Sequence, residues 1–110
     1  MAKAETRIVK QIIEGLREKY PQAYLRKIHG NPFQHVGIPD IVGCIEGCFI
    51  GLEVKTTSGR TSQIQVLEGL SICQSDGIHG VVTDLEEALQ VVEIGLSIHK
   101  INLGIPDALG

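Results

Sequence analysis

The predicted fold of this chain is built around one stretch, residues 37–55, which reads G-I-P-D-I-V-G-C-I-E-G-C-F-I-G-L-E-V-K. Two apolar runs, 41–45 and 48–54, flank Glu46-Gly47. This pattern predicts a β-hairpin, because Gly readily adopts the positive φ angle that a tight turn needs. If Glu46-Gly47 is a two-residue loop, the numbers of facing residues sum to 93, and Glu53 then faces Asp40.

Asp40 and Glu53 form an unusual pair in such a hairpin. Strands that are apolar on both faces belong to the interior of a sheet, where a buried unpaired charge costs several kcal/mol. Lys55 projects from the same face as Glu53, two residues further on. A hard cation such as Mg²⁺, which prefers oxygen ligands, would relieve the repulsion between the carboxylates. The alternative is two solvated strand-end carboxylates, with Lys55 as a salt-bridge partner.

Length and composition predict one globular domain over residues 1–110, with a core at about 4–95 and a tail at 96–110. Hydrophobic residues make up 43% of the chain and charged residues 21%, as in ordinary soluble proteins. No apolar run approaches the roughly 18 residues of a membrane span, and the first residues lack the apolar core of a signal peptide. We therefore expect an intracellular, cytoplasmic protein without a membrane span.

Charge and cysteine content exclude some classes of site. The net charge of −3 argues against a generally basic nucleic-acid coat, although a local basic groove remains compatible with it. The three cysteines are an odd number, and the hairpin register places Cys44 and Cys48 on opposite faces of the sheet. Neither a disulfide framework nor a zinc site is indicated.

The first element is predicted to be an amphipathic helix over residues 4–20. Ile8, Ile12 and Leu16 recur with helical period, and Glu5 lies in line with this apolar stripe, whereas Glu14 lies on the opposite face. Glu5 has two interpretations. It stabilises the helix N-terminus through the macrodipole, or it reaches under the sheet towards Asp40 and Glu53.

A strand over 24–29 carries Arg26 and Lys27, and a loop over 30–37 follows it. This loop region holds residue types that can touch phosphates or stack on bases, but its composition is also that of an ordinary loop. These residues are His29, Asn31, Phe33 and His35.

The second half of the chain is predicted to form a helix over 62–75, a strand over 78–83 and a helix over 84–94. The first of these helices has a predicted buried stripe made of Val66, Leu67, Leu70 and Cys73. Gln65 lies three residues after Ser62, a spacing typical of a capping box. Its functional interpretation is contact with Lys55 or with a substrate phosphate, and the sequence geometry favours the cap.

The element order αβββαβα, with carboxylates on a central hairpin, resembles the PD-(D/E)XK nuclease superfamily. Within it the chain is similar to the VRR-NUC (virus-type replication-repair nuclease) domain over roughly residues 5–92. The resemblance rests on four elements in order: a helix-one Glu at Glu5, G-x-P-D at 37–40, E-V-K at 53–55, and a turn at 59–65 that ends in Gln65. In that turn, Gln63 and Thr61 replace the usual Pro and Leu. The fold it implies is α/β, a restriction-endonuclease-like core whose mixed four-stranded sheet is flanked by helices.

The resemblance implies a metal-dependent deoxyribonuclease that hydrolyses phosphodiester bonds. Mg²⁺ or Mn²⁺ would be held by Asp40, Glu53, the main-chain carbonyl of Val54 and Glu5. Lys55 would orient the attacking water or steady the charge of the transition state, and Gln65 would hold Lys55 or the phosphate. Small free-standing members imply a homodimer that cuts branched DNA or four-way junctions, of viral or mobile-element origin.

Two other classes of function remain as alternatives. A non-catalytic DNA-binding or assembly module could retain the nuclease fold, and loss of Asp40, Glu53 or Lys55 would favour it; all three are present. A metal-dependent phosphoesterase acting on small nucleotides would leave plasmid DNA almost uncut.

Overall fold

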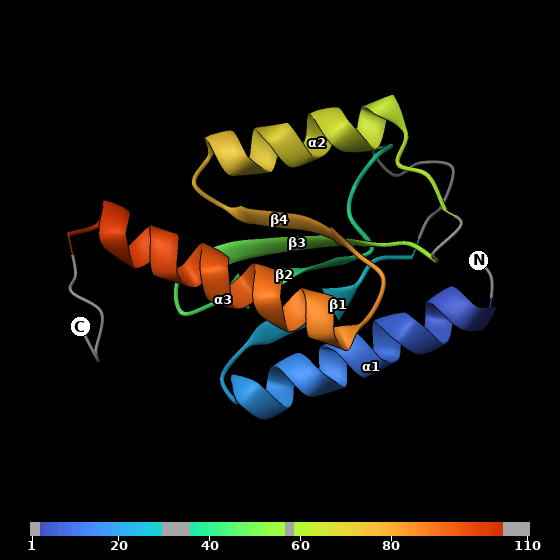
Figure 1. Cartoon of the computed structure of the whole chain (residues 1–110), viewed down its shortest axis with the longest axis horizontal. Helices are drawn as coiled ribbons and strands as arrows, with labels where there is room; N and C mark the ends of the chain where they lie inside the picture. Colours follow the sequence, from blue (N-terminus) through green and yellow to red (C-terminus); the bar gives the residue numbers. More distant parts are fainter. Residues whose placement is uncertain (1–2, 30–35, 57–58, 105–110) are drawn as a thin grey trace.

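The computed structural model describes residues 3–29, 36–56 and 59–104, and within them it has the expected element order (Figure 1). The elements are α1 (Lys3–Lys19), β1 (Tyr24–Lys27), β2 (Ile41–Ile45), β3 (Cys48–Val54), α2 (Gln63–Gln74), β4 (Ile78–Val82) and α3 (Leu85–Asn102). Asn31, Phe33, His35 and residues 105–110 lie outside the described part of the chain. None of the described helices is long and apolar enough to cross a membrane.

The four strands form one mixed sheet in the order β1-β2-β3-β4. β2 is antiparallel to both β1 and β3, whereas β4 is parallel to β3 and is reached by a crossover through α2. Helices α1 and α3 pack against one face of the sheet, and α2 lies on the other face over β3 and β4 (Figure 1). The sheet therefore has one fully covered face and one that a single helix covers.

The central hairpin has the predicted register. Ile45 faces Cys48 and Ile41 faces Leu52 across a turn in which Glu46 and Gly47 have φ angles of 52° and 81°. Two successive positive φ angles are typical of the type I′ turn, whose twist matches that of the flanking strands. Cys48 is buried and Cys44 is exposed, so the two cysteines point to opposite faces as expected.

The hydrophobic core lies between the sheet and the pair α1 and α3. Alternate residues of β3 point into it, and Gly51 and Glu53 point to the α2 face instead. The buried apolar side chains of this core include Val9, Ile12, Leu16, Leu25, Ile41, Ile50, Leu52, Val54, Val82, Ala88, Val92 and Leu96.

The predicted buried stripe of α2 is wrong. Val66, Leu67 and Leu70 are 48%, 65% and 53% exposed, and Cys73 is exposed as well. The helix turns Gln65, Glu68, Gly69 and Ile72 towards the sheet instead. Because α2 is apolar almost all round, its sequence does not single out one face.

The predicted end of the last helix at residue 94 is also wrong, since α3 continues to Asn102. Much of the expected tail is therefore helical. Gly95 does not end the helix, because its missing side chain gives room to Ile78. A Cβ atom at residue 95 would lie 2.6 Å from the Cγ1 atom of Ile78.

Candidate metal and phosphate site

Asp40 and Glu53 meet at the end of the sheet where β3 finishes. The main-chain N–H of Ile28 donates to the carbonyl oxygen of Asp40 at 2.8 Å, which extends the β1–β2 pairing to this residue. The main-chain N–H of Val54 donates to Oδ2 of Asp40, also at 2.8 Å. These two hydrogen bonds fix the Asp40 carboxyl beside Glu53, as the hairpin register predicts.

Glu53 is the only buried charged side chain among the described residues, with 3% of its surface exposed. Its pKa is raised from 4.5 to about 7, chiefly by burial and then by the neighbouring Asp40, through its charge and a hydrogen bond between the carboxyls. Lys55 opposes this shift, since its Nζ atom lies 3.6 Å from Oε1 of Glu53. One lysine does not compensate the burial of Glu53 and the charge of Asp40 beside it.

Gln65 connects α2 to the carboxylate pair. Its Oε1 atom accepts from the N–H of Ser62 at 3.0 Å, while its own main-chain N–H donates to the Ser62 hydroxyl oxygen at 3.2 Å, which completes the predicted capping box. At the same time its Nε2 atom donates to Oε1 of Glu53 at 2.7 Å. The cap and the site contact therefore coexist, and the observed partner is Glu53, a contact that sequence reasoning missed. The signal was the cap itself, because it fixes the side chain at the helix end nearest the hairpin.

The predicted ligand set is only partly assembled. In the described parts of the chain, no three His, Cys, Asp or Glu side chains gather closely enough to hold a metal. Glu5, half-buried near the start of α1, is thus not grouped with Asp40 and Glu53. The proposed roles of Glu5 and of the Val54 carbonyl stay predictions. His29 is exposed and belongs to no such group either.

The residues present fit a hard divalent cation. Two carboxyl groups converge in a partly dry environment, and burial together with the Asp40 carboxyl raises the pKa of Glu53. Carboxylate oxygens are the ligands that Mg²⁺ and Mn²⁺ prefer. A dication between Asp40 and Glu53 would offset both the burial and the repulsion.

Comparisons with known proteins address the fold. No protein-family model matches the sequence, and no curated protein is similar enough to be matched. One solved structure, described as a "VRR_NUC domain", superposes with a TM-score of 0.62. The match covers 84% of this chain and 97% of that chain at 20% sequence identity. The mixed sheet, the order αβββαβα and this superposition show that the chain has the fold of a VRR_NUC domain.

Proposed function

We propose that this protein is a metal-dependent DNA endonuclease. One observation carries the proposal: Asp40, Glu53, Lys55 and Gln65 lie together at one end of the sheet, in a fold shared with a VRR_NUC domain. Structural ion pairs also perturb pKa values, but a buried carboxyl group beside a second carboxyl, with one lysine nearby, is typical of a functional site.

Asp40 and Glu53 would hold Mg²⁺ or Mn²⁺, with the Val54 carbonyl and Glu5 as further ligands. When bound, such a cation stabilises negative charge on a phosphate and lowers the pKa of a water molecule. Asp40 is held in place for this role by the Val54 N–H, and Glu53 by the Gln65 amide. Ligands that are fixed before the cation arrives lose less conformational freedom on binding it.

Lys55 would act on the phosphate. Its side chain is 19% exposed and its Nζ atom lies 3.6 Å from Glu53, so it is close to the carboxylates while remaining accessible. From there the ammonium group can orient a water molecule or stabilise charge that develops on a phosphodiester. Gln65 acts through Glu53 and is a positioning residue.

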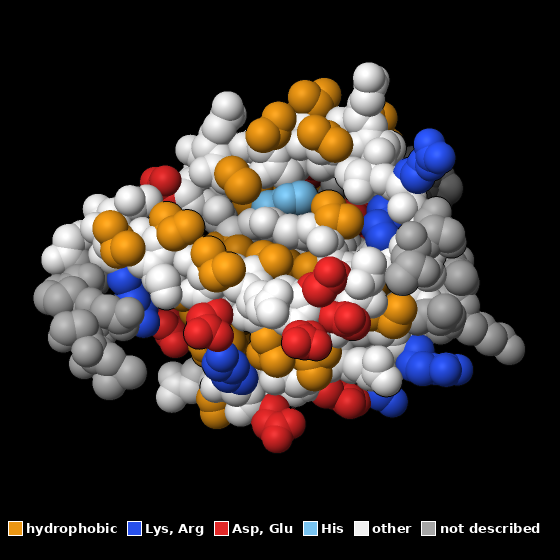
Figure 2. All heavy atoms as spheres, viewed as in Figure 1, with side chains coloured by type: hydrophobic (Ala, Val, Ile, Leu, Met, Phe, Trp, Pro, Cys, Tyr) orange, Lys and Arg blue, Asp and Glu red, His pale blue; other side chains and the backbone are white. Residues whose placement is uncertain are grey.

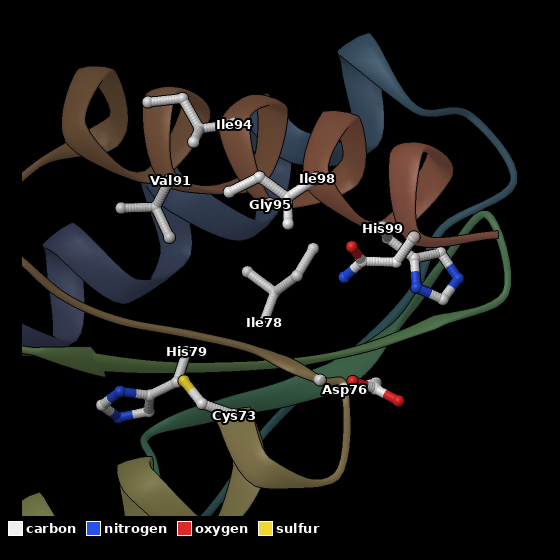
Figure 3. A pocket seen from close by; sticks show the side chains of 11 residues that line it. Cys73, Asp76, Ile78, His79, Val91, Ile94, Gly95, Ile98 and His99 are labelled. Atoms are coloured by element: carbon white, nitrogen blue, oxygen red, sulfur yellow. The ribbon is translucent and has the colours of Figure 1, made fainter. Parts of the chain in front are cut away.

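The same proposal includes a homodimer. Helix α2 contains one charged residue, Glu68, which is half-buried. Its outer face and the adjoining face of α3 form an apolar surface on both sides of a hollow of about 420 Å³ (Figures 2 and 3). The exposed side chains of this apolar surface are Ile64, Val66, Leu67, Leu70, Ile94, Ile98 and Ile101.

A second copy of the chain is the partner that fits this surface. Because almost no charge lies on it, a two-fold interface would bring apolar side chains against apolar side chains without unpaired charges. In Figure 3, Ile94, Ile98 and Val91 of α3 line one wall of the hollow, opposite Cys73 and His79. Such a dimer would place two sites on one DNA molecule, as concerted cutting of a symmetric four-way junction requires.

Light scattering at micromolar concentration tests the dimer. We expect a mass of twice 11.9 kDa, and we expect Leu67→Asp to reduce it to the monomer mass. A wild-type mass near 11.9 kDa would remove the dimer from the proposal.

A cleavage panel tests the activity and its substrate. Linear duplex, flap and four-way DNA would be incubated with the protein in Mg²⁺ and in EDTA. We expect cleavage only with the metal, and faster cleavage of branched DNA than of linear duplex. Metal binding without cleavage of any substrate would favour a non-catalytic DNA-binding module instead.

A further inference from the structure

Two arginines converge at the free edge of the sheet, on β1. The Nη2 atom of Arg17 donates to the carbonyl oxygen of Leu25 at 2.9 Å, and the Nη1 atom of Arg26 donates to the same oxygen at 3.0 Å. In an antiparallel ladder, every second residue of an edge strand hydrogen-bonds to the neighbouring strand. Ile28 is one of these residues, since its N–H donates to Asp40, just before β2, so Leu25 is not. The carbonyl of Leu25 therefore points away from β2, and one accepting oxygen holds both guanidinium groups close together.

This arginine pair has no acidic partner among the residues that the structure describes. Neither Arg17 nor Arg26 forms an ion pair with a described carboxylate, whereas Lys19 pairs with Glu93 at 3.1 Å and Lys100 pairs with Glu46 at 3.4 Å. Two like charges held side by side repel, and both are exposed to solvent. An anion with several oxygens would bridge them favourably, and guanidinium groups match the geometry of phosphate.

An exposed aromatic ring adjoins the arginine pair. The guanidinium carbon of Arg26 lies 4.6 Å from the centroid of the Tyr24 ring, and Tyr24 is 56% exposed. The strand register puts Tyr24 opposite Cys44, and Cys44 opposite Phe49, which is 46% exposed. Tyr24 also borders a hollow of about 620 Å³ at this end of the sheet. Helix α2 covers β3 and β4, so the ring of Tyr24 is accessible from this face.

The carboxylate pair lies on the same face of the sheet. Residues 24, 26 and 28 of the first strand region share a face, as do 40, 42 and 44 of the second. Tyr24 pairs with Cys44 and Arg26 with Val42, and the next row contains Asp40 and Glu53. At about 3.4 Å per residue, the Tyr24 row is roughly 14 Å from the carboxylate row, four residues along the strand. A nucleic-acid strand bound at one row thus continues directly to the other.

We propose that Arg17, Arg26 and Tyr24 form a binding site for an unpaired nucleotide of the DNA substrate. The two arginines bind its phosphate, and the ring of Tyr24 stacks on its base. The nucleotide must be unpaired, because a base inside a duplex presents only its edges in the grooves. Stacking on an exposed aromatic ring requires a free base face. This inference rests on the proposed nuclease function and defines which part of a branched substrate the protein holds.

The site lies at the β1 edge, and the apolar surface proposed for dimerisation lies on α2 and α3, beside the opposite edge strand β4. A dimer formed there would leave the nucleotide site open in both copies. Each copy would then hold one unpaired strand near its own carboxylate pair.

Fluorescence anisotropy in EDTA tests the site without cleavage. The probes are a labelled blunt duplex and the same duplex with an unpaired arm, and the variants are Tyr24→Ala, Tyr24→Phe and Arg26→Ala. We expect Tyr24→Ala to weaken binding of the armed duplex by about 5- to 100-fold and binding of the blunt duplex by less than about twofold. Tyr24→Phe should bind as the wild type does, because the ring is kept. Arg26→Ala should reduce the salt dependence of binding to the armed duplex.

Arg7→Ala is the matched control. Arg7 is an exposed arginine on the same helix as Arg17, about 15 Å away along the helix axis. Replacing it should change the affinity for neither the armed duplex nor the blunt duplex. Equal binding of the armed duplex by Tyr24→Ala and the wild type would overturn the inference, and so would equal losses on both DNA probes. Either result, together with Mg²⁺-dependent cleavage by the wild type, would leave the nuclease proposal standing. A wild-type protein that binds neither the armed nor the blunt duplex would overturn both this inference and the nuclease proposal.

Discussion

Replacing Glu53 by Gln should stabilise the metal-free protein at pH 8. The folded protein raises the pKa of Glu53 from 4.5 to about 7, chiefly through burial and secondly through Asp40. At pH values below 4.5 the carboxyl is protonated in the folded and the unfolded chain, so it imposes no penalty. As the pH rises from 4.5 to 7 the unfolded chain ionises first, and the folded state loses stability relative to it.

The size of this penalty follows from the two pKa values. Each pH unit between them corresponds to about 1.36 kcal/mol, so the interval from 4.5 to about 7 gives roughly 3 kcal/mol above pH 7. Glu53→Gln has the same shape, and its amide oxygen can still accept from Nε2 of Gln65. The variant should therefore be up to about 3 kcal/mol more stable than the wild type at pH 8, and nearly equal to it at pH 4.5.

Urea unfolding in EDTA at both pH values measures this difference. Glu14→Gln, at an exposed position on α1, is the control and should change stability little at either pH. Adding Mn²⁺ at pH 8 should stabilise the wild type by mass action and should stabilise Glu53→Gln less. If Glu53→Gln is less stable than the wild type at pH 8 in EDTA, the account of the carboxylate pair as electrostatically unsatisfied is wrong.

Three further predictions concern Lys55, Glu5 and the packing of α2. Lys55→Ala should abolish cleavage yet retain Mn²⁺ binding by calorimetry, because an ammonium group is not a metal ligand. Glu5→Gln should weaken Mn²⁺ binding, whereas the control Glu14→Gln should not. Identical Mn²⁺ binding by the two Glu variants would remove Glu5 from the ligand set. Gly69→Ala should lower stability by about 1–3 kcal/mol in thermal unfolding, since the new Cβ would lie 2.5 Å from the His79 ring. Adding His79→Ala to the Gly69→Ala variant should restore the stability. A Gly69→Ala protein as stable as the wild type would contradict this packing.

The hairpin and the carboxylate pair were predictable because they depend on local rules. A two-residue turn fixes a register, and the register fixes which side chains meet. Asp40 and Glu53 are neighbours in the structure for this reason. The same rules placed Gln65 at the start of α2, but the choice of Glu53 as its partner depends on how α2 sits on the sheet, which is a tertiary property.

The inward face of α2 was not predictable from periodicity. Its apolar residues surround the helix, so several faces are equally suited to burial. Packing against the sheet selects one of these faces. The ring of His79 packs against Gly69, and Ile72 lies close to Gly51 of β3. Burial lowers the pKa of His79, which favours the neutral ring in this contact. Similarly, α3 continues through Gly95 because Ile78 fills the space beside it.

The arginine pair at the β1 edge of the sheet could not be predicted from the sequence either. Arg17 and Arg26 come from different elements and meet only because α1 packs along the first strand. The alternation of strand 24–27 does indicate that Tyr24 and Arg26 share a face. Their accessibility depends on α2 covering only β3 and β4 on that face of the sheet, and not β1.

The rate of DNA cleavage by Asp40→Asn tests whether Asp40 and Glu53 form the active site. Asn retains an oxygen that can accept from the Val54 N–H, so the fold should persist while one carboxylate is lost. In Mg²⁺, under single-turnover conditions on branched DNA, we expect the wild type and Glu14→Gln to cut at equal rates, and Asp40→Asn to be slower by at least about a hundredfold. Cleavage by Asp40→Asn at the wild-type rate would contradict the assignment of the site.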